Sequence, residues 1–282
     1  MILLVPADPM RPRRADEHFA GEAAAAREAG IEVAVVDHDA LSRPGPEGDA
    51  AAVARVTAGE DAVYRGWMLH AGQYARLETA LAARGTVLRT GAAQYRRAHE
   101  LPGWYDALTG WTPESVWTDG DDPGAFAKAC AVLGEGPAVL RDYSKSLKHH
   151  WDEAAFIPDV ADAERAAAVG RRFRELRDDD FTGGWVLRRF ERFTGAEVRT
   201  WWVGGECRLS TAHPDTPGDP PPPGFDPAPL APAVSGLGLP FVTADLTRDD
   251  AGRWRVVEIG DGQVSDLPRG AGAAELIAAL NG

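Results

Sequence analysis

Carboxylates recur close together near the end of the chain. The stretch from Pro240 to Asp261 contains two runs rich in Val, Phe, Trp and Thr that flank a polar DDAG turn. This pattern predicts a β-hairpin with Asp245 in the first strand and Glu258 in the second. Neighbouring strands lie about 5 Å apart, so both carboxylates could reach one cation, and Asp261 follows at the strand end. Oxygen ligands of this kind suit Mg²⁺, although a surface hairpin with solvated acids would have the same pattern.

Basic residues gather in a second stretch, AVLRDYSKSLKHH. Arg141 lies at the end of an apolar run, and Lys145 and Lys148 follow within seven residues. Such closely spaced cations repel one another unless an anion lies between them, and a polyphosphate would satisfy all of them. A solvated basic loop is the alternative. The adjacent His149 and His150 cannot easily face one metal ion together, so we do not expect them to be metal ligands.

A carboxylate and a guanidinium also lie two residues apart in EVRTWWV. Alternation with a period of two places Glu197 and Arg199 on one face of a strand, with Thr200 and Trp202 on the other. The carboxylate could accept hydrogen bonds from ribose hydroxyls, and the guanidinium could bind phosphate. An ordinary exposed strand face would look the same.

Length and charge narrow the classes of function. A chain of 282 residues predicts two or three lobes. The net charge of −13, without a basic tail or an aromatic RNA-binding signature, disfavours a nucleic-acid partner, although local basic clusters can still serve an anionic small ligand. The opening MILLVPADPM has too short an apolar run for a signal peptide or a membrane span. Cys130 and Cys207 are far apart in sequence, which fits a reducing cytoplasm and leaves a disulfide between them open.

The first ninety residues alternate apolar runs with helical segments. Runs such as ILLV and IEVAVVD are separated by helical patterns at residues 15–29, 49–57 and 74–84. This alternation predicts βαβ units and a mostly parallel sheet. Ligands bind where such strands end, so Arg65 and Trp67 are candidates for substrate contact. An arginine that pairs at the sheet end explains Arg65 equally well.

The rest of the chain predicts mixed α and β structure. We expect a helical, aromatic segment from Ala92 to Trp117, in which a lone His99 is an ordinary packed residue. Three short strands are expected across WVLRRFERFTGAEVRTWWVGGECRLS, followed by a proline-rich loop or lid from Thr211 to Pro232. Helices are predicted at residues 124–133, 161–177 and 273–280.

Taken in order, these parts resemble the ATP-grasp superfamily. The strand with cations matches AVLRDYSKS, the central Gly-x-Glu turn matches Gly195-Ala196-Glu197, and the terminal Asp…Glu-x-Asn signature matches Asp245 and Glu258. Arg141, Lys145 and Lys148, with the ending EIGDGQVSDLP, resemble the clade named for one arginine and two lysines. The resemblance implies a parallel α/β pre-ATP-grasp domain and a two-lobed ATP-grasp domain. Its parts would be 1–92, a first lobe at 93–188 and a second lobe at 189–282.

The resemblance also implies roles for individual residues. The strand cations would bind ATP phosphates or adenine, and the backbone of Arg189, Phe190 and Glu191 would be the hinge that carries adenine. Glu197 would hold the ribose. Arg199 would act on the γ-phosphate side, with Arg141 as the other catalytic cation. Asp245 and Glu258 would bind Mg²⁺, and Asp261 would replace the usual Asn, because Gly260 stands where the family has that residue.

The implied activity is an ATP- and Mg²⁺-dependent ligase that joins a carboxylate to an amine through an acylphosphate. Its partner would be a small molecule or a peptide, with no membrane or nucleic acid. No Walker A loop, Gly-x-Ser-x-Gly or Cys/His cluster competes with this interpretation. The alternatives are an ATP-dependent phosphotransferase and a nucleotide-binding module without catalysis. The oligomeric state is open, and several ATP-grasp ligases are dimers.

Overall fold

The computed structural model describes residues 1–43, 45–268 and 272–282. The chain divides into two compact units. Unit 1 contains Met1–Ala98, Ala196–Leu246 and Glu258–Gly282, and unit 2 contains His99–Gly195 and Thr247–Val257. No helix among the described residues is both long enough and apolar enough to span a membrane. Cys130 and Cys207 are both free thiols.

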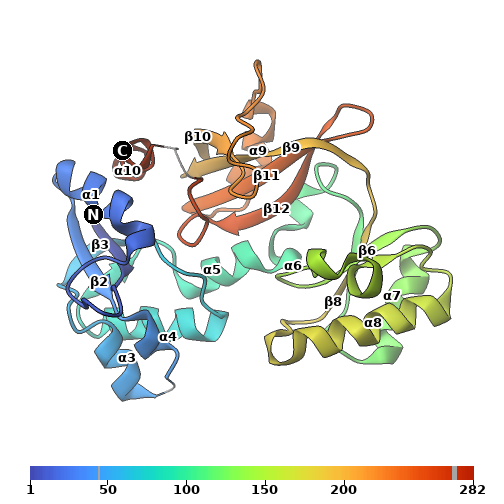
Figure 1. Cartoon of the computed structure of the whole chain (residues 1–282), viewed down its shortest axis with the longest axis horizontal. Helices are drawn as coiled ribbons and strands as arrows, with labels where there is room; N and C mark the ends of the chain where they lie inside the picture. Colours follow the sequence, from blue (N-terminus) through green and yellow to red (C-terminus); the bar gives the residue numbers. More distant parts are fainter. Residues whose placement is uncertain (44, 269–271) are drawn as a thin grey trace. The chain divides into compact units, whose positions relative to one another are not determined.

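Unit 1 begins with the predicted parallel sheet, whose strands β2 and β3 are labelled in Figure 1. Its strand order is β2-β1-β3-β4. Its strands are β1 (Ile2–Pro6), β2 (Glu32–Val36), β3 (Gly59–Tyr64) and β4 (Thr86–Leu88). The helices between and after them are α1 (Ala20–Glu28), α2 (His38–Leu41), α3 (Pro46–Ala52), α4 (Ala71–Ala82) and α5 (Ala92–His99). The helix predicted at 49–57 in fact begins at Pro46, whose fixed φ suits the first helical position.

Both faces of this parallel sheet are buried, as the alternation along β1 requires. Ile2 and Leu4 belong to a core with α4 residues such as Leu77, whereas Leu3 and Val5 belong to a second core with α1. Ile277 also packs in the second core, from the last helix α10 (Ala273–Asn281). The end of the chain therefore helps to cover the strand at its beginning.

The second sheet has the order β10-β9-β11-β12. Its strands are β9 (Phe193–Val203), β10 (Glu206–Ala212), β11 (Phe241–Asp249) and β12 (Trp254–Asp261), so the predicted hairpin with Asp245 and Glu258 is confirmed. In the proline-rich segment, residues 213–227 form neither helix nor strand, and a 3₁₀ turn (Ala228–Leu230) and α9 (Ala231–Gly236) follow.

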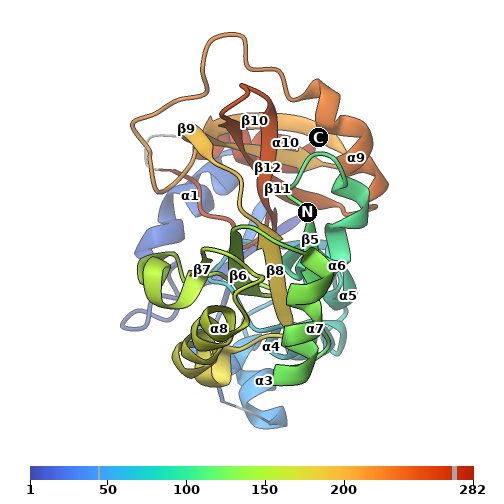
Figure 2. The ribbon, with the colours of Figure 1, turned by 90° about the vertical axis from the view of Figure 1, so that its right-hand side faces the viewer.

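Unit 2 is built around an antiparallel sheet in the order β5-β8-β6-β7. The strands are β5 (Ser115–Trp117), β6 (Ala138–Asp142), β7 (Phe156–Ile157) and β8 (Trp185–Arg189). Helices α7 (Pro123–Leu133) and α8 (Ala163–Arg177) lie side by side (Figure 2) and pack on the sheet through Phe126, Phe173 and Trp185.

The prediction of a helical segment from Ala92 to Trp117 is partly wrong. After α5 and the short α6 (Leu101–Trp104), the chain makes a 3₁₀ turn (Asp106–Leu108) and then enters β5. Pro113 disfavours helix just before this point, and Ser115–Trp117 pair with β8 instead. Short helices and turns complete unit 2, namely a 3₁₀ turn (Lys148–His150), a π turn (Trp151–Ala155) and a 3₁₀ turn (Asp178–Asp180).

Candidate functional site

Arg199 and Asp245 form a buried ion pair in the second sheet. The Arg199 Nε donates to Asp245 Oδ1 and its second terminal nitrogen donates to Oδ2, both at 2.8 Å. The two side chains are 11% and 7% exposed. The remaining nitrogen donates to the backbone carbonyl of Asp266 at 3.0 Å. A bidentate pair of this geometry is strong and fixes both side chains.

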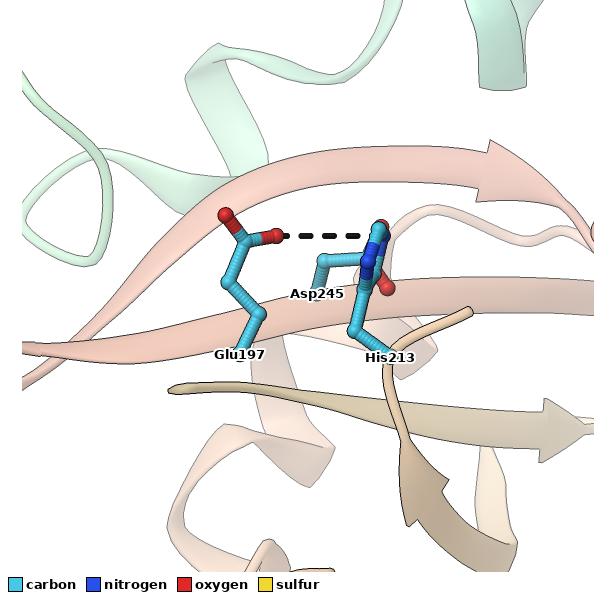
Figure 3. A group of neighbouring side chains, drawn as sticks. All are labelled: Glu197, His213 and Asp245. Carbon is cyan, nitrogen blue, oxygen red and sulfur yellow. Dashed lines mark ion pairs between the residues drawn. The ribbon is translucent and has the colours of Figure 1, made fainter. Parts of the chain in front are cut away.

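His213 joins this pair at the first residue after β10. Its Nε2 lies 3.5 Å from Asp245 Oδ2, 3.8 Å from Glu197 Oε2 and 3.1 Å from the Arg199 guanidinium. The side chains of Glu197, His213 and Asp245 point toward one another (Figure 3). One ligand atom from each of the three lies within 4.8 Å of the others. Sequence reasoning missed His213, because a lone histidine at the start of a proline-rich loop has no motif spacing.

The charges in this cluster shift the pKa values of Asp245 and His213. Burial alone would raise the pKa of Asp245, but the charge and hydrogen bonds of Arg199, with His213, lower it to about 2. Burial opposes protonation of His213, yet the hydrogen bond and charge of Asp245 raise its pKa. Asp245 is therefore ionised at neutral pH, as a metal ligand must be.

Glu258 lies on the same face of the sheet as Asp245. A side chain at Gly260, two residues after Glu258, would meet the Thr243 hydroxyl, and Thr243 lies two residues before Asp245. The period-two pleat therefore places Thr243, Asp245, Glu258 and Gly260 on one face. Burial alone would lower the pKa of Arg199, but the charge and hydrogen bonds of Asp245 raise it, and the charge of Glu258 adds to this effect. The structure thus brings Glu197, Arg199, Asp245 and Glu258 together.

Asp261 points away from this face, which corrects its prediction as a metal ligand. It lies three residues after Glu258 in β12, and an odd separation places the two on opposite faces. Its side chain is 0% exposed, and its Oδ1 accepts from the Gln263 backbone N–H at 2.7 Å. Its Oδ2 is buried without a hydrogen-bond partner. Burial raises the pKa of Asp261 to about 7, with the Gln263 donors and Arg65 opposing the shift.

Two hydroxyls lie beside Gly260, at the position where the resemblance implied an Asn. A Cβ at Gly260 would lie 2.9 Å from Thr243 Oγ1 and 3.1 Å from Ser265 Oγ. These hydroxyls are 2.7 Å apart, and Ser265 donates to the Asp261 carbonyl. A larger side chain at Gly260 would therefore have to displace this pair of hydroxyls.

Arg65 serves the fold, which corrects its prediction as a substrate contact. It is 1% exposed, and two of its nitrogens donate to the Glu22 carboxylate at 2.7 Å. A third donates to the carbonyls of Gly262 and Ser265. Its donors are therefore occupied by the chain itself. Trp67, by contrast, is 37% exposed and contacts His18 with its ring tilted by 43°, the ring centroids being 4.5 Å apart.

In unit 2, the predicted cations lie at the end of β6 and on the loop that follows it. Arg141 is buried and donates to the Ser144 carbonyl, whereas Lys145 and Lys148 are exposed. The loop is fixed by Asp142, which is 0% exposed. Its Oδ1 accepts from the backbone N–H groups of Ser144 and Lys145, and its Oδ2 accepts from Arg177 and from the Thr182 backbone. Asp142 was not identified from the sequence.

The predicted hinge, Arg189 to Glu191, leads from β8 to β9. Arg189 donates to the carbonyls of Leu133 and Glu135, Phe190 packs on Phe156, and Glu191 accepts two hydrogen bonds from Arg255 at 2.7 Å. These side chains are engaged within unit 2, and the backbone N–H groups of Arg189 and Phe190 donate to the carbonyls of Glu114 and Pro137.

The oxygen donors of the cluster fit a hard divalent cation. Asp245 and Glu197 offer carboxylates and His213 a nitrogen within 4.8 Å of one another, and Glu258 lies on the same face of the sheet. A cation at Asp245 would compete with Arg199, which already bonds both of its oxygens.

Comparison with known proteins relates this geometry to solved structures. One is a RimK domain protein ATP-grasp from Sphaerobacter thermophilus, at 20% identity over 99% of each chain with a TM-score of 0.63. A second is the D-cycloserine synthetase DcsG, at 18% identity over 99% of this chain and 98% of that one, with a TM-score of 0.62. A third is the ATP-grasp ligase PsnB complexed with a minimal precursor, Mg and ADP, at 14% identity over 99% and 97%, with a TM-score of 0.58. These similarities concern the fold, and the named proteins include ligases and synthetases.

No curated protein matches the sequence. A family model of the ATP-grasp domain, that of family 3 in the clade named for one arginine and two lysines, matches residues 132–280, which is more than half of the chain. The protein therefore belongs to the ATP-grasp family, in the clade that Arg141, Lys145 and Lys148 had indicated.

Proposed function

We propose that the protein is an ATP- and Mg²⁺-dependent ligase that joins a carboxylate to an amine or a similar nucleophile. The observation that carries the proposal is the convergence of Glu197, Arg199, Asp245 and Glu258 on one face of the second sheet. The burial of Asp245 and Arg199 is costly for a fold alone, because both of these charges lose hydration. A binding site for a cation and a phosphate would explain why these charged side chains lie together.

In this proposal Asp245 and Glu258 hold Mg²⁺, and Glu197 binds the ribose. Bound Mg²⁺ would neutralise charge on the transferred phosphoryl group. An incoming phosphate offers Arg199 a second oxyanion, so the guanidinium can release Asp245 and stabilise the phosphate instead. The ion pair thus keeps both groups positioned and ionised until the substrate arrives.

The end of β6 and the loop after it supply phosphate donors in the same scheme. Arg141, Lys145 and Lys148 bind the phosphates, and the backbone at Phe190 and Glu191 carries the adenine. Asp142 preorganises this loop through its contacts with the Lys145 N–H and Arg177.

The reaction needs no side-chain nucleophile. The substrate carboxylate attacks the γ-phosphorus of ATP and ADP leaves, which gives an acylphosphate. The amine then attacks the acyl carbon, loses a proton and displaces inorganic phosphate. The protein contributes position and positive charge. Because the ATP-grasp ligase PsnB was also solved with a precursor peptide, peptides are the first substrates to test, beside amino acids.

The test is ATP turnover to ADP and phosphate with panels of carboxylates and amines, comparing wild type with Glu258→Ala. We expect the variant to lose at least a hundredfold in turnover and to require more Mg²⁺. Unchanged turnover in the variant would refute the metal assignment. Mass spectrometry of the product distinguishes a ligase from a phosphotransferase, because only the latter would leave a phosphorylated product. Binding of Mg-ATP without turnover across the panel would favour a non-catalytic module.

A further inference from the structure

Three neighbouring strands each bring one potential metal ligand to the same point of the second sheet. Glu197 is in β9, Asp245 is in β11, and His213 directly follows β10. Strand β9 lies between the other two. One ligand atom from each residue lies within 4.8 Å of the others (Figure 3). The proposed function assigns Asp245 to Mg²⁺ and Glu197 to the ribose, and it gives His213 no part.

The distances from His213 are close to those around a single small cation. Its Nε2 lies 3.5 Å from Asp245 Oδ2 and 3.8 Å from Glu197 Oε2. Zinc binds imidazole nitrogen and carboxylate oxygen at about 2.0–2.2 Å, so two ligand atoms of a tetrahedral ion lie about 3.3–3.6 Å apart. The contact with Asp245 is already in this range, and the contact with Glu197 is slightly longer.

The backbone around His213 holds its ring in this position. The His213 N–H donates to the Glu197 carbonyl at 3.2 Å, so the two residues face each other across adjacent strands. The His213 carbonyl accepts from the Thr216 N–H at 2.9 Å, which closes a turn after β10. On the other side of the ring, the Asp215 N–H donates to Nδ1 at 3.2 Å, and Asp215 Oδ2 lies 3.9 Å from the same nitrogen. A carboxylate at this position is a common partner of a metal-bound histidine.

The imidazole nitrogen changes which cation the group prefers. Mg²⁺ favours oxygen ligands, whereas Zn²⁺ binds both imidazole and carboxylate. One imidazole and two carboxylates supply three protein ligands and leave a fourth position for water. The side chain of His213 is 14% exposed and that of Glu197 is 37% exposed, so an ion can reach the group from solvent.

Arg199 already places positive charge among these ligands. One of its terminal nitrogens lies 2.8 Å from Asp245 Oδ2 and 3.1 Å from His213 Nε2. Its Nε donates to the other oxygen of Asp245 at 2.8 Å. An ion needs only Oδ2 of Asp245, so it competes with one of these two hydrogen bonds. Removal of the guanidinium should therefore strengthen the binding of an ion.

We propose that Glu197, His213 and Asp245 bind a Zn²⁺ ion in the nucleotide-free protein, and that this ion competes with Mg-ATP. The ion would engage Glu197, which otherwise binds the ribose, and Asp245, which otherwise binds Mg²⁺. The competition therefore rests on the proposed function, whereas the binding of Zn²⁺ does not. Zinc would act as a reversible inhibitor of the ligase.

The first experiment is isothermal titration of the nucleotide-free, full-length protein with Zn²⁺. We expect wild type to bind one ion in this group, His213→Asn and Glu197→Gln to bind it about tenfold or more weakly, and Arg199→Gln to bind it more tightly. The matched control is His150→Asn, which removes an exposed histidine that also lies beside a carboxylate, that of Glu153. The control should bind within twofold of wild type. Thermal unfolding of each variant checks that the fold is intact.

Equal affinity for Zn²⁺ in wild type and in His213→Asn would overturn the proposed site, as would the absence of Zn²⁺ binding to wild type. Either result is independent of any ligase activity, because no nucleotide or substrate is present.

The second experiment measures the binding of Mg-AMPPNP at free Zn²⁺ concentrations set by a chelator, because the nucleotide itself binds zinc. We expect the apparent Kd of wild type to rise with Zn²⁺, and the rise to need about tenfold more Zn²⁺ in His213→Asn. An unchanged Kd in zinc-bound wild type would overturn the competition. Failure of Mg-AMPPNP to bind even without zinc would contradict the proposed function, and with it the competition, but would leave the zinc site standing.

Discussion

At the scale of single residues, the cluster around Asp245 shows how one carboxylate can be buried and still ionised. Desolvation disfavours its charge, and two hydrogen bonds from Arg199 outweigh that cost. Asp261 has no such partner and shows the opposite result, because burial dominates there. Two acids of one hairpin thus shift in opposite directions, because Arg199 lowers the pKa of Asp245 to about 2 whereas burial raises that of Asp261 to about 7.

Asp261 makes a prediction about stability and pH. Its pKa rises from an ordinary 3.8 to about 7 on folding, so the folded chain holds the proton more tightly than the unfolded chain. The stability that this gives is fully present below the unfolded value and is lost as pH rises through the folded value. Asp261→Asn stays neutral. Between pH 5 and pH 8, the free energy of unfolding of wild type should therefore fall by about 2–3 kcal/mol more than that of the variant.

Urea denaturation at pH 5, 6, 7 and 8 measures this difference. Asp250→Asn, at an exposed position in the turn between β11 and β12, is the control and should follow wild type. Parallel curves for wild type and Asp261→Asn would show that Asp261 is ionised in the folded protein.

At the scale of elements, the loop after β6 depends on one buried carboxylate. Asp142 accepts hydrogen bonds from the backbone of two separate segments, at Ser144 and Lys145 and at Thr182, and from Arg177 of α8. A loop that is preorganised in this way loses less entropy when it binds phosphate. The position of Lys145 is therefore set by Asp142.

Asp142→Asn should test this positioning role. The amide keeps one acceptor oxygen but loses the negative charge that Arg177 and the backbone donors need. We expect the KM for ATP to rise about tenfold while kcat changes less than about threefold, because lost preorganisation weakens phosphate binding. Steady-state kinetics measures both constants. Asp152→Asn, on the exposed π turn nearby, is the control, and a KM for ATP that matches wild type in Asp142→Asn would rule the role out.

Helices and strands could be predicted from the sequence wherever the local pattern of apolar and polar residues determines them. Alternating apolar and polar residues predicted the strands β8 to β10 and the β11–β12 hairpin, and the parallel sheet followed from its helices. The change from helix to strand before β5 was not predictable from the sequence, because aromatic residues occur in both. The pairing of β5 with β8 determines that this segment is a strand. The alternation of side chains along β12 could have excluded Asp261 as a metal ligand from the sequence, because residues an odd number of positions apart lie on opposite faces of a strand. His213 and Asp142 could not be found, because their roles arise from contacts between distant segments.

At the scale of the whole molecule, the ends of the chain depend on each other. Leu276 and Leu280 of α10 pack with Val63, Trp201 and Phe241, and Ile277 packs with Leu3 and Val5. The proposed division at residues 92 and 188 treats the first part as a domain. Its core nevertheless contains side chains from the last helix, which lies more than 180 residues later.

This dependence predicts that Ile277→Ala destabilises the amino-terminal sheet. The substitution leaves a cavity beside Val5, so the free energy of unfolding should fall by about 2–4 kcal/mol. Hydrogen exchange should become faster in β1 and α1, although the substitution is in α10. Glu275→Ala, on the exposed side of the same helix, should leave both quantities unchanged. A fragment of residues 1–92 should lack cooperative unfolding, since it retains the strands without α10. A cooperatively folded fragment, together with unchanged exchange in Ile277→Ala, would show that the first part is an autonomous domain.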